Sequence, residues 1–255
     1  IDYVSDLALL NVKDLKTIVQ WNNEMGIKLF RLSSQIFAWS DEYKLSDLKD
    51  YDEICSMMLE IGKIATDANQ RLTMHPGPYN CLASPNQKVV EKTIRELNCH
   101  SEQFNMLGFK PSNYNKINIH VGGAYGDKKG TLERFCKNFE LLNDDTKKRL
   151  VIENDDSPNE YSVKDLFDGI YQTIGIPITF DYFHHKFNTG GLTEEEALKM
   201  AAITWPEGIA QCCHYSESRR KEKLDESIRP QAHSDIIYEK IQTYGLEPDI
   251  VIEAK

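Results

Sequence analysis

Several short apolar segments of this chain end in histidine, aspartate or glutamate residues. This pattern is typical of proteins that bind metal ions for catalysis. In the segment ITFDYFHHKFN, residues 178–188, Asp181 and the adjacent His184 and His185 come directly after a run of apolar residues. Imidazole and carboxylate groups are the ligands that Mn²⁺, Zn²⁺ and Fe²⁺ accept in proteins. The segment therefore predicts metal ligands at Asp181 and His184, with His185 packed into the interior.

The same arrangement recurs at the ends of six successive segments. One such residue alone is more often structural, but burying many of them without compensation costs about several kcal/mol each. Bound cations would remove that cost, and the set exceeds the four ligands of one tetrahedral site, so we expect two or three divalent metals. The candidate ligands are His75, His120, Glu153, Asp181, His184, His214 and Glu253.

Eight short runs rich in β-forming residues carry these groups. They lie at 1–5, 28–34, 71–75, 116–123, 149–155, 177–183, 209–216 and 249–255. Between them, apolar residues spaced by threes and fours, such as Val90, Ile94 and Leu97, predict amphipathic helices. Strands that alternate with helices predict parallel pairing, and eight such units predict an α/β fold, a single (β/α)8 TIM barrel.

In a TIM barrel the functional residues lie at the C-terminal ends of the strands, where the candidate ligands fall. We expect residues 1–255 to form one domain of this kind. A helix normally covers the last strand of such a barrel, and none follows the run at 249–255, so the helix after strand 8 is expected to be missing.

Composition narrows the class of protein. At 255 residues and 40% hydrophobic residues the chain can bury one large core. No apolar run reaches the roughly 18 residues that span a bilayer, and the start lacks signal-peptide features, so we expect an intracellular protein without a membrane partner. The six cysteines show no paired spacing and are expected to be reduced. A net charge of −10 disfavours nucleic acid only weakly, because basic groups cluster at 127–130, 147–149 and 218–223.

Three classes of function are compatible with a metal cluster in a barrel mouth. Clustered cations cleave phosphate esters, because they activate water and stabilise the attacked and leaving oxygens. A metal-dependent sugar or sugar-phosphate isomerase on the same barrel is the alternative. A binding module without activity leaves the array of ligands unexplained.

Seven motifs, in this order, resemble those of the UV damage endonucleases, whose fold is related to endonuclease IV. They are FRLSS (30–34), TMHPGPY (73–79), IHVGGAYG (119–126), VIENDD (151–156), DYFHH (181–185), RPQAH (229–233) and IEAK (252–255). The resemblance implies a DNA repair enzyme that nicks duplex DNA immediately 5′ of pyrimidine dimers, and of abasic sites as a further substrate, leaving a 3′ hydroxyl. It also implies a divalent-metal cluster, commonly of Mn²⁺, and damaged double-stranded DNA as the partner. The types of ligand also allow Zn²⁺ or Fe²⁺, and we expect a monomer.

The resemblance assigns roles to individual residues. It adds His233 to the metal ligands His75, His120, Glu153, Asp181, His184, His214 and Glu253, and we expect Glu153, Asp181 and His214 to be catalytic. Tyr79, with Pro78 before it, matches a pair that wedges into the duplex at the lesion, and Tyr3 matches a DNA-facing position at the end of strand 1. We expect Lys128, Lys129, Arg219 and Arg220, from loops at the barrel mouth, to contact phosphates.

Three positions depart from the family pattern. Pro78 replaces a glutamine of the family. Cys212 stands where several members carry a lysine, and we expect the Cys212 thiol to be a packing residue rather than a metal ligand. The loop after strand 2 reads WSDEY (39–43) and lacks the usual histidine ligand, which leaves Asp41, Glu42 or water as replacements. His100 is expected to be structural.

Overall fold

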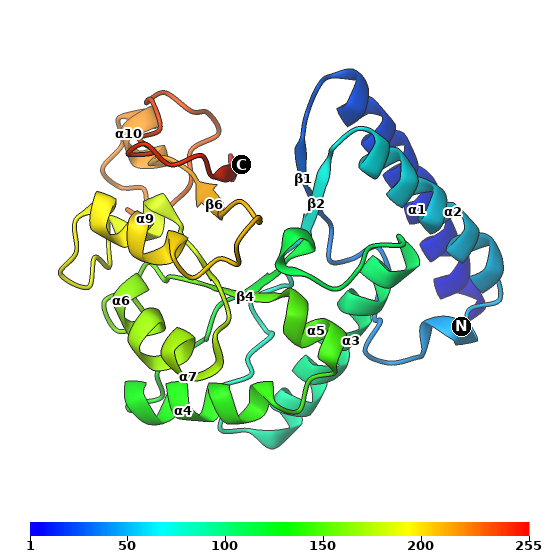
Figure 1. Ribbon diagram of the computed structural model, residues 1–255, viewed down its shortest axis with the longest axis horizontal. Helices are drawn as coiled ribbons and strands as arrows, with labels where there is room; N and C mark the ends of the chain where they lie inside the picture. The colour runs from blue at the N-terminus through cyan, green and yellow to red at the C-terminus, as the bar shows by residue number, and fades with distance from the viewer. Residues whose placement is uncertain (255) are drawn as a thin grey trace. The chain divides into compact units, whose positions relative to one another are not determined.

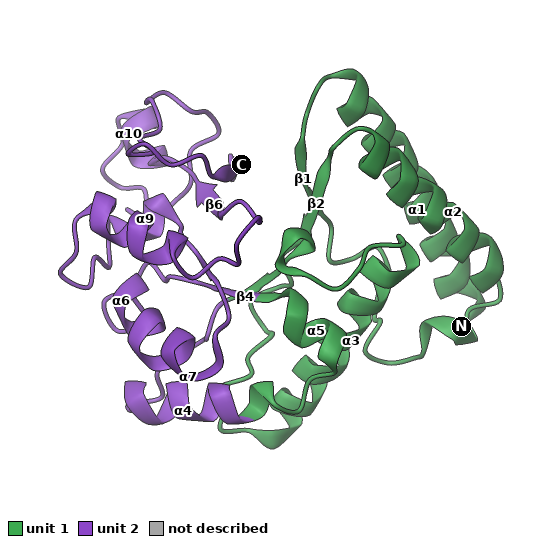
Figure 2. Ribbon diagram, viewed as in Figure 1, with its two compact units in different colours: residues 1–119, 138–150 green, residues 120–137, 151–255 purple. Residues whose placement is uncertain are grey.

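The computed structural model describes residues 1–254 and divides into two compact units (Figure 2). Unit 1 holds residues 1–119 and 138–150, and unit 2 holds residues 120–137 and the chain from residue 151 onward. The chain crosses between the units three times, between residues 119 and 120, 137 and 138, and 150 and 151, so each unit is built from segments distant in sequence. Figure 1 traces the order of the elements.

Unit 1 contains the first helices and strands of the chain. Its elements are α1 (Asp2–Glu24), β1 (Leu29–Leu32), η1 (Leu45–Asp47), α2 (Tyr51–Asp67), β2 (Arg71–Met74), α3 (Gln87–Met106), η2 (Asn113–Asn115), β3 (Ile117–Ile119) and α5 (Asp144–Arg149). The three strands are parallel, with β1 paired to β2 and β2 to β3.

Helices α1 and α2 lie side by side and bury stripes of identical spacing (Figure 1). In α1 the buried apolar residues fall at positions 8, 12, 15 and 19, and in α2 they fall at 54, 58, 61 and 65. Residues three and four apart share one face of a helix, so each stripe is continuous along its helix. Burial of these faces holds the helix pair together.

Unit 2 contains the remaining elements. They are α4 (Lys128–Phe139) and β4 (Leu150–Glu153), both shared with unit 1, then α6 (Val163–Leu166), η3 (Phe167–Tyr171), α7 (Gln172–Ile174), β5 (Ile178–Thr179), α8 (Tyr182–His185), α9 (Glu194–Ala202), β6 (Cys212–Tyr215), α10 (Arg219–Lys223) and β7 (Asp249–Ile252). Strand β4 pairs with β5 and β6 with β7, both in parallel. A single parallel bridge between Asp181 and His214 joins the two pairs.

The α/β class with parallel strands is confirmed, and seven of the eight predicted strands are present among the described residues. The predicted strand at 1–5 is wrong, because these residues begin or lie within α1. Ser5 is buried and starts the helical stripe that continues through Ala8 and Val12 without a Gly or Pro between them. Tyr3 therefore lies on a helix with 70% of its surface exposed, and not at a strand end.

No helix among residues 1–254 is long and apolar enough to cross a membrane. All six cysteines are free thiols in the structure, and five of them are buried. Cys212 is fully buried in β6.

We predict that Gly62→Ala destabilises unit 1. Gly62 of α2 faces the end of α3 so closely that a Cβ atom there would lie 1.7 Å from the Leu107 carbonyl oxygen. Alanine normally favours a helix over glycine by about 1 kcal/mol, but displacing this backbone should give a net loss of roughly 1–3 kcal/mol. Urea melts measure the difference.

Gly77→Ala is the control, since a Cβ atom at Gly77 meets nothing within 4 Å. Its free energy of unfolding should stay within about 0.5 kcal/mol of the parent. A Gly62→Ala protein that is more stable than the parent would contradict the packing of α2 on α3.

Candidate metal centre

The pairing of the strands in unit 2 brings four candidate ligands to neighbouring strand ends. Glu153 is the last residue of β4, and Asp181 follows β5 and bridges to His214 of β6. His214 lies opposite Val251 of β7, and Glu253 comes directly after that strand. Because parallel strands end at the same edge, residues far apart in the sequence become neighbours.

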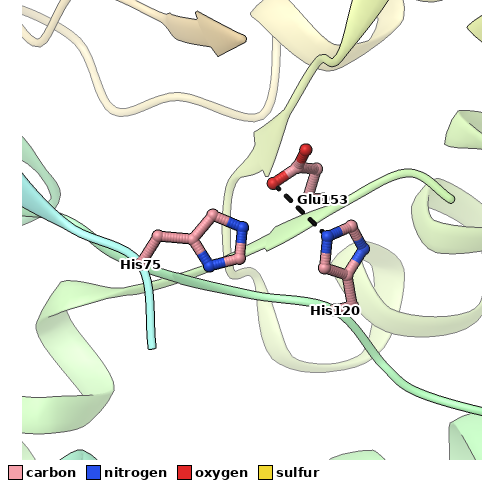
Figure 3. Close-up of side chains that lie close together, drawn as sticks. All are labelled: His75, His120 and Glu153. Carbon is pink, nitrogen blue, oxygen red and sulfur yellow. Dashed lines mark ion pairs between the residues drawn. The ribbon is translucent and has the colours of Figure 1, made fainter. Parts of the chain in front are cut away.

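Glu153 lies at the centre of three histidines. Its Oε2 atom is 3.1 Å from Nδ1 of His214 and 3.7 Å from Nε2 of His120, the ion pair drawn in Figure 3. Its Oε1 atom is 3.5 Å from Nδ1 of His184. The Glu153 side chain is only 1% exposed, so these contacts lie away from solvent.

Glu253 connects His214 to a fourth histidine, His233. Its Oε1 atom lies 3.3 Å from Nδ1 of His214 and its Oε2 atom lies 3.6 Å from Nδ1 of His233. His233 lies on no helix or strand, but a bridge to Ser218, just before α10, fixes its backbone. The fold thus brings His233 to the site although its place in the sequence gives no signal of a strand end.

Asn154 fixes the segment that carries Asp181 and His184. The Asn154 side chain donates to the Asp181 carbonyl at 3.0 Å and accepts from the Asp181 N–H at 2.8 Å. The Asp181 carboxylate caps α8 by accepting from the His184 N–H at 2.8 Å, and the Asn154 carbonyl lies 2.8 Å from Nδ1 of His184. Sequence reasoning missed Asn154, whose only signal was its position directly after Glu153.

Burial and neighbouring charges shift the pKa values of Asp181, His120 and His184. Burial raises the pKa of the Asp181 carboxyl, and the carboxylates of Glu153 and Glu253 raise it further against the opposing effect of His184. Burial disfavours a charged His120, but the carboxylates of Glu153 and Asp155 outweigh it and raise the pKa of His120. Asp181 and Glu153 raise the pKa of His184 in the same way, against its burial.

These residues fit a divalent cation. Glu153, Asp181 and His214 are all buried and offer ligand atoms that lie within 4.8 Å of one another. Within the described chain the buried Oδ2 atom of Asp181 has no hydrogen-bond partner. Two carboxylates and an imidazole form a donor set suited to Mn²⁺, Zn²⁺ or Fe²⁺, and the cation would replace the repulsion between the carboxylates by attraction.

His75 belongs to unit 1, where it directly follows β2 as predicted. Its Nδ1 atom lies 3.0 Å from the Pro76 carbonyl oxygen. Of the eight predicted ligands, the seven others lie in unit 2: His120, Glu153, Asp181, His184, His214, His233 and Glu253. The role of His75 as a ligand stays a prediction.

The remaining histidines behave as structural residues. His185 is 3% exposed, and its ring packs 5.4 Å from that of Phe180, which confirms its predicted interior position. Burial lowers the pKa of His185, which favours the neutral ring. His100 is fully buried in α3, where its Nε2 atom lies 3.6 Å from Glu96.

The residues suggested as substitutes for the missing loop histidine lie in unit 1. Asp41 pairs with Lys92 at 3.1 Å. Neither Asp41 nor Glu42, nor Cys212 in unit 2, belongs to any of the groups of potential metal ligands found among residues 1–254. Cys212 is thus consistent with the predicted packing role.

The predicted DNA-facing residues differ in their exposure. Tyr79 is 89% exposed on the loop after β2, and Pro78 beside it is exposed as well. Tyr79 and Trp39 line one cavity of about 430 Å³ in unit 1. Tyr79 therefore has the surface position that a wedge requires.

The four basic residues predicted to contact phosphates all have acidic neighbours. Nζ of Lys128 lies 3.0 Å from Asp165, and Nζ of Lys129 lies 3.9 Å from Glu133. Arg219 pairs with Asp235, and Arg220 pairs with Glu226 at 2.9 Å. Because each charge is partly compensated locally, a phosphate would have to compete with these carboxylates. Their DNA contacts stay a prediction.

A family profile and individual relatives assign this chain to the same protein family. The family profile described as UV-endonuclease UvdE matches residues 1–255. The UV-damage endonuclease of Schizosaccharomyces pombe is 37% identical over 264 residues, which cover 100% of this chain and 43% of that protein. The UV DNA damage endonuclease of Clostridium perfringens is 33% identical over 251 residues, covering 96% of this chain and 59% of that protein. The chain thus spans about two fifths to three fifths of the length of these relatives.

Solved structures confirm the predicted fold class. The crystal structure of SacUVDE superposes with a TM-score of 0.85 at 31% identity, covering 99% of this chain and 83% of that chain. An L-ribulose 3-epimerase superposes with a TM-score of 0.61 at 15% identity, covering 95% of this chain and 76% of that chain. These neighbours are TIM barrels, and the low identity of the epimerase makes it a likeness of fold alone.

We predict that Mn²⁺ stabilises the parent protein and that Glu153→Gln removes most of this stabilisation. A ligand that binds only the folded state at about 100 times its Kd contributes about 2.7 kcal/mol, roughly 5–10 °C in Tm for a chain of this size. Thermal melts of chelator-treated protein, with and without added Mn²⁺, measure the shift. Glu207→Gln, an exposed acid in unit 2, should keep the full shift. Equal shifts in the two variants would remove Glu153 from the metal site.

Proposed function

Because the chain belongs to the UV-endonuclease UvdE family, we propose that it is a metal-dependent endonuclease acting on double-stranded DNA that carries UV damage. The buried group of Glu153, Asp181 and His214 is the observation that supports a metal-dependent reaction. The reaction is hydrolysis of a phosphodiester bond immediately 5′ of a photoproduct such as a pyrimidine dimer, leaving a 3′ hydroxyl. Abasic sites are a further proposed substrate in this DNA repair activity.

The proposed ligands in unit 2 are His120, Glu153, Asp181, His184, His214, His233 and Glu253. His75 of unit 1 is proposed as a further ligand on the family resemblance alone. These residues would hold two or three divalent cations, Mn²⁺ foremost, which would supply Lewis-acid stabilisation of phosphate oxygens and an activated water. We place Glu153, Asp181 and His214 closest to the reaction, since they are buried together.

The protein's own contribution is rigidity. Asn154 holds the backbone of Asp181 from both sides, and the Asp181 carboxylate is fixed by the N–H of His184. Ligands held in place need little reorganisation when charge develops on the phosphate, which is the main source of electrostatic catalysis. Burial of Glu153 and His214 strengthens the same interactions by excluding water.

Lesion recognition is assigned to the loop after β2. A photoproduct is poorly stacked and paired, so displacing it from the helix costs less than displacing normal bases. Tyr79 would fill the space that the displaced bases leave. Pro78 before it carries no side-chain hydrogen-bonding group, which makes this wedge apolar and tolerant of different lesions.

The alternative function, a sugar or sugar-phosphate isomerase, gains nothing from the epimerase neighbour, which shares only the fold. An exposed Tyr79 on the loop next to a candidate ligand suits a duplex better than a small sugar. We further propose that residues 1–255 act as one domain and a monomer inside the cell.

Nicking of a duplex with one defined pyrimidine dimer tests the proposal. The parent protein with Mn²⁺ should cut next to the dimer, chelation should abolish cutting, and added Mn²⁺ should restore it. We predict that Glu153→Gln lowers turnover at least about 100-fold, or about 2.7 kcal/mol of transition-state stabilisation. Glu207→Gln is the control for loss of one acidic charge. Undiminished cutting by metal-free protein, or epimerisation of a ketose without DNA cleavage, would contradict the proposal.

We predict that Tyr79→Ala reduces discrimination between damaged and intact duplex by roughly 1–3 kcal/mol, the range for stacking of one base on an aromatic ring. Bound Mn²⁺ should not change, because the effect arises from stacking. Nicking rates on matched duplexes with a dimer, an abasic site or no damage give the measurement. Trp21→Ala, which removes another exposed aromatic from unit 1, should discriminate as the parent does. Full discrimination by Tyr79→Ala would place the wedge in another loop.

A further inference from the structure

The carboxylate of Asp155 contacts a candidate ligand although sequence reasoning gave it no role. Its Oδ1 atom lies 2.7 Å from Nδ1 of His120, the shortest ion pair that either of these groups makes among the described contacts. Asp155 is buried, and it lies two residues after Glu153.

A loop holds the Asp155 carboxylate in this position. Its Oδ2 atom accepts from the Tyr161 N–H at 3.2 Å, and the Asp155 N–H donates to the Tyr161 carbonyl at 2.9 Å. Tyr161 is itself fully buried. Both carboxylate oxygens are thus engaged, one by the loop and one by the imidazole.

This contact determines which nitrogen of His120 faces the centre. With Nδ1 directed at Asp155, the other nitrogen, Nε2, is directed at Glu153, 3.7 Å from its Oε2 atom. The Nδ1 atom of His184 also has a partner after Glu153, the Asn154 carbonyl at 2.8 Å, although this nitrogen lies 3.5 Å from Glu153 as well. Two successive residues after Glu153 therefore each engage the Nδ1 atom of a different candidate ligand.

We propose that Asp155 is a positioning residue that orients His120 and fixes Nδ1 as its protonated nitrogen, so that Nε2 binds a cation. This inference rests on the proposed metal centre. A carboxylate that accepts from a metal-bound imidazole fixes its tautomer and raises its basicity, and loss of such a partner typically costs about 10–100-fold in metal affinity.

Metal affinity tests the role through two substitutions. Asp155→Asn keeps the shape and an oxygen acceptor but removes the charge, and Asp155→Ala removes both. Titration with Mn²⁺, with free Mn²⁺ followed by electron paramagnetic resonance, should show weaker binding by about 10-fold for Asp155→Asn and up to about 100-fold for Asp155→Ala. Raising the Mn²⁺ concentration should restore nicking on the dimer duplex to Asp155→Asn further than to Asp155→Ala.

Two matched controls separate positioning from loop stability and from charge. Asp156→Asn removes the adjacent carboxylate, which faces Arg229 at 3.4 Å. Asn188→Ala removes a 2.8 Å bond from Asn188 to the Ser157 carbonyl, which ties down the same loop. Both controls should bind Mn²⁺ within about threefold of the parent, a small difference beside the loss expected for a ligand's partner.

A spectroscopic readout reports the imidazole directly. In Zn²⁺-loaded protein with ¹⁵N-labelled histidine, two-bond correlations identify which nitrogen carries the proton. His120 should carry it on Nδ1 in the parent, whereas Asp155→Ala should lose this single form. Unchanged Mn²⁺ affinity and an unchanged His120 signal in Asp155→Ala would overturn the positioning role.

The outcomes also separate this inference from the proposed function. A parent protein that binds neither Mn²⁺ nor Zn²⁺ would overturn the metal centre and with it the role of Asp155. A parent that binds metal and nicks damaged DNA, with Asp155 variants that bind equally well, would overturn the positioning role alone. Circular dichroism checks that each variant is folded, and Asp155→Asn, which preserves the side-chain shape, carries the test if Asp155→Ala does not fold.

Discussion

The crowding of buried carboxylates around Glu153 is the constraint on which unit 2 depends. Glu153 is nearly inaccessible to solvent. The Asp181 carboxylate interacts electrostatically with His184, and the Glu253 carboxylate lies 3.3 Å from His214. Taking such charges out of water costs about several kcal/mol for each ion unless opposite charges compensate. The histidines compensate in part, which is why the pKa values of His120 and His184 are raised. A divalent cation, which Glu153, Asp181 and His214 could bind, would complete this compensation.

The strands of unit 2 impose this crowding through backbone hydrogen bonds. Pairing of β4 with β5 and of β6 with β7 fixes Glu153, His214 and the start of the Glu253 segment. The His214 N–H donates to the Phe180 carbonyl at 2.9 Å, which holds the Asp181 segment against β6. Each of these contacts joins residues that are close in space and far apart in the sequence. The candidate ligands are therefore held together by the stability of the whole fold and not by local conformational propensity.

Much of this arrangement could be predicted from the sequence because it follows a simple rule. Apolar runs that end in His, Asp or Glu predicted the ends of β2, β3, β4, β6 and β7, and the rule for parallel strands predicted that such ends meet. The assignment of a strand to residues 1–5 failed since five residues with two β-branched side chains suit a strand or a helix start equally. The burial of Ser5, Ala8 and Val12 on one face, which decides for a helix, requires the partner α2.

Contacts across the fold could not be predicted by the same means. Asn154 and Asp155 were invisible as functional residues, because their roles depend on where Asp181 and His120 lie in space. The compensation of Arg219 by Asp235 likewise joins residues whose proximity the sequence does not state. Sequence reasoning thus found the residues that could touch a cation and missed those that hold them.

The balance of charge also bears on how a chain of net charge −10 could bind DNA. A phosphate backbone requires positive charge, yet the basic residues Lys128, Arg219 and Arg220 already face carboxylates. The centre itself is acidic without cations, since Glu153, Asp181 and Glu253 converge there. In the proposed enzyme, therefore, the cations would contribute attraction for the scissile phosphate as well as the chemistry. Residues that set metal affinity, Asp155 among them, would then govern DNA binding through the metal and not through contacts of their own.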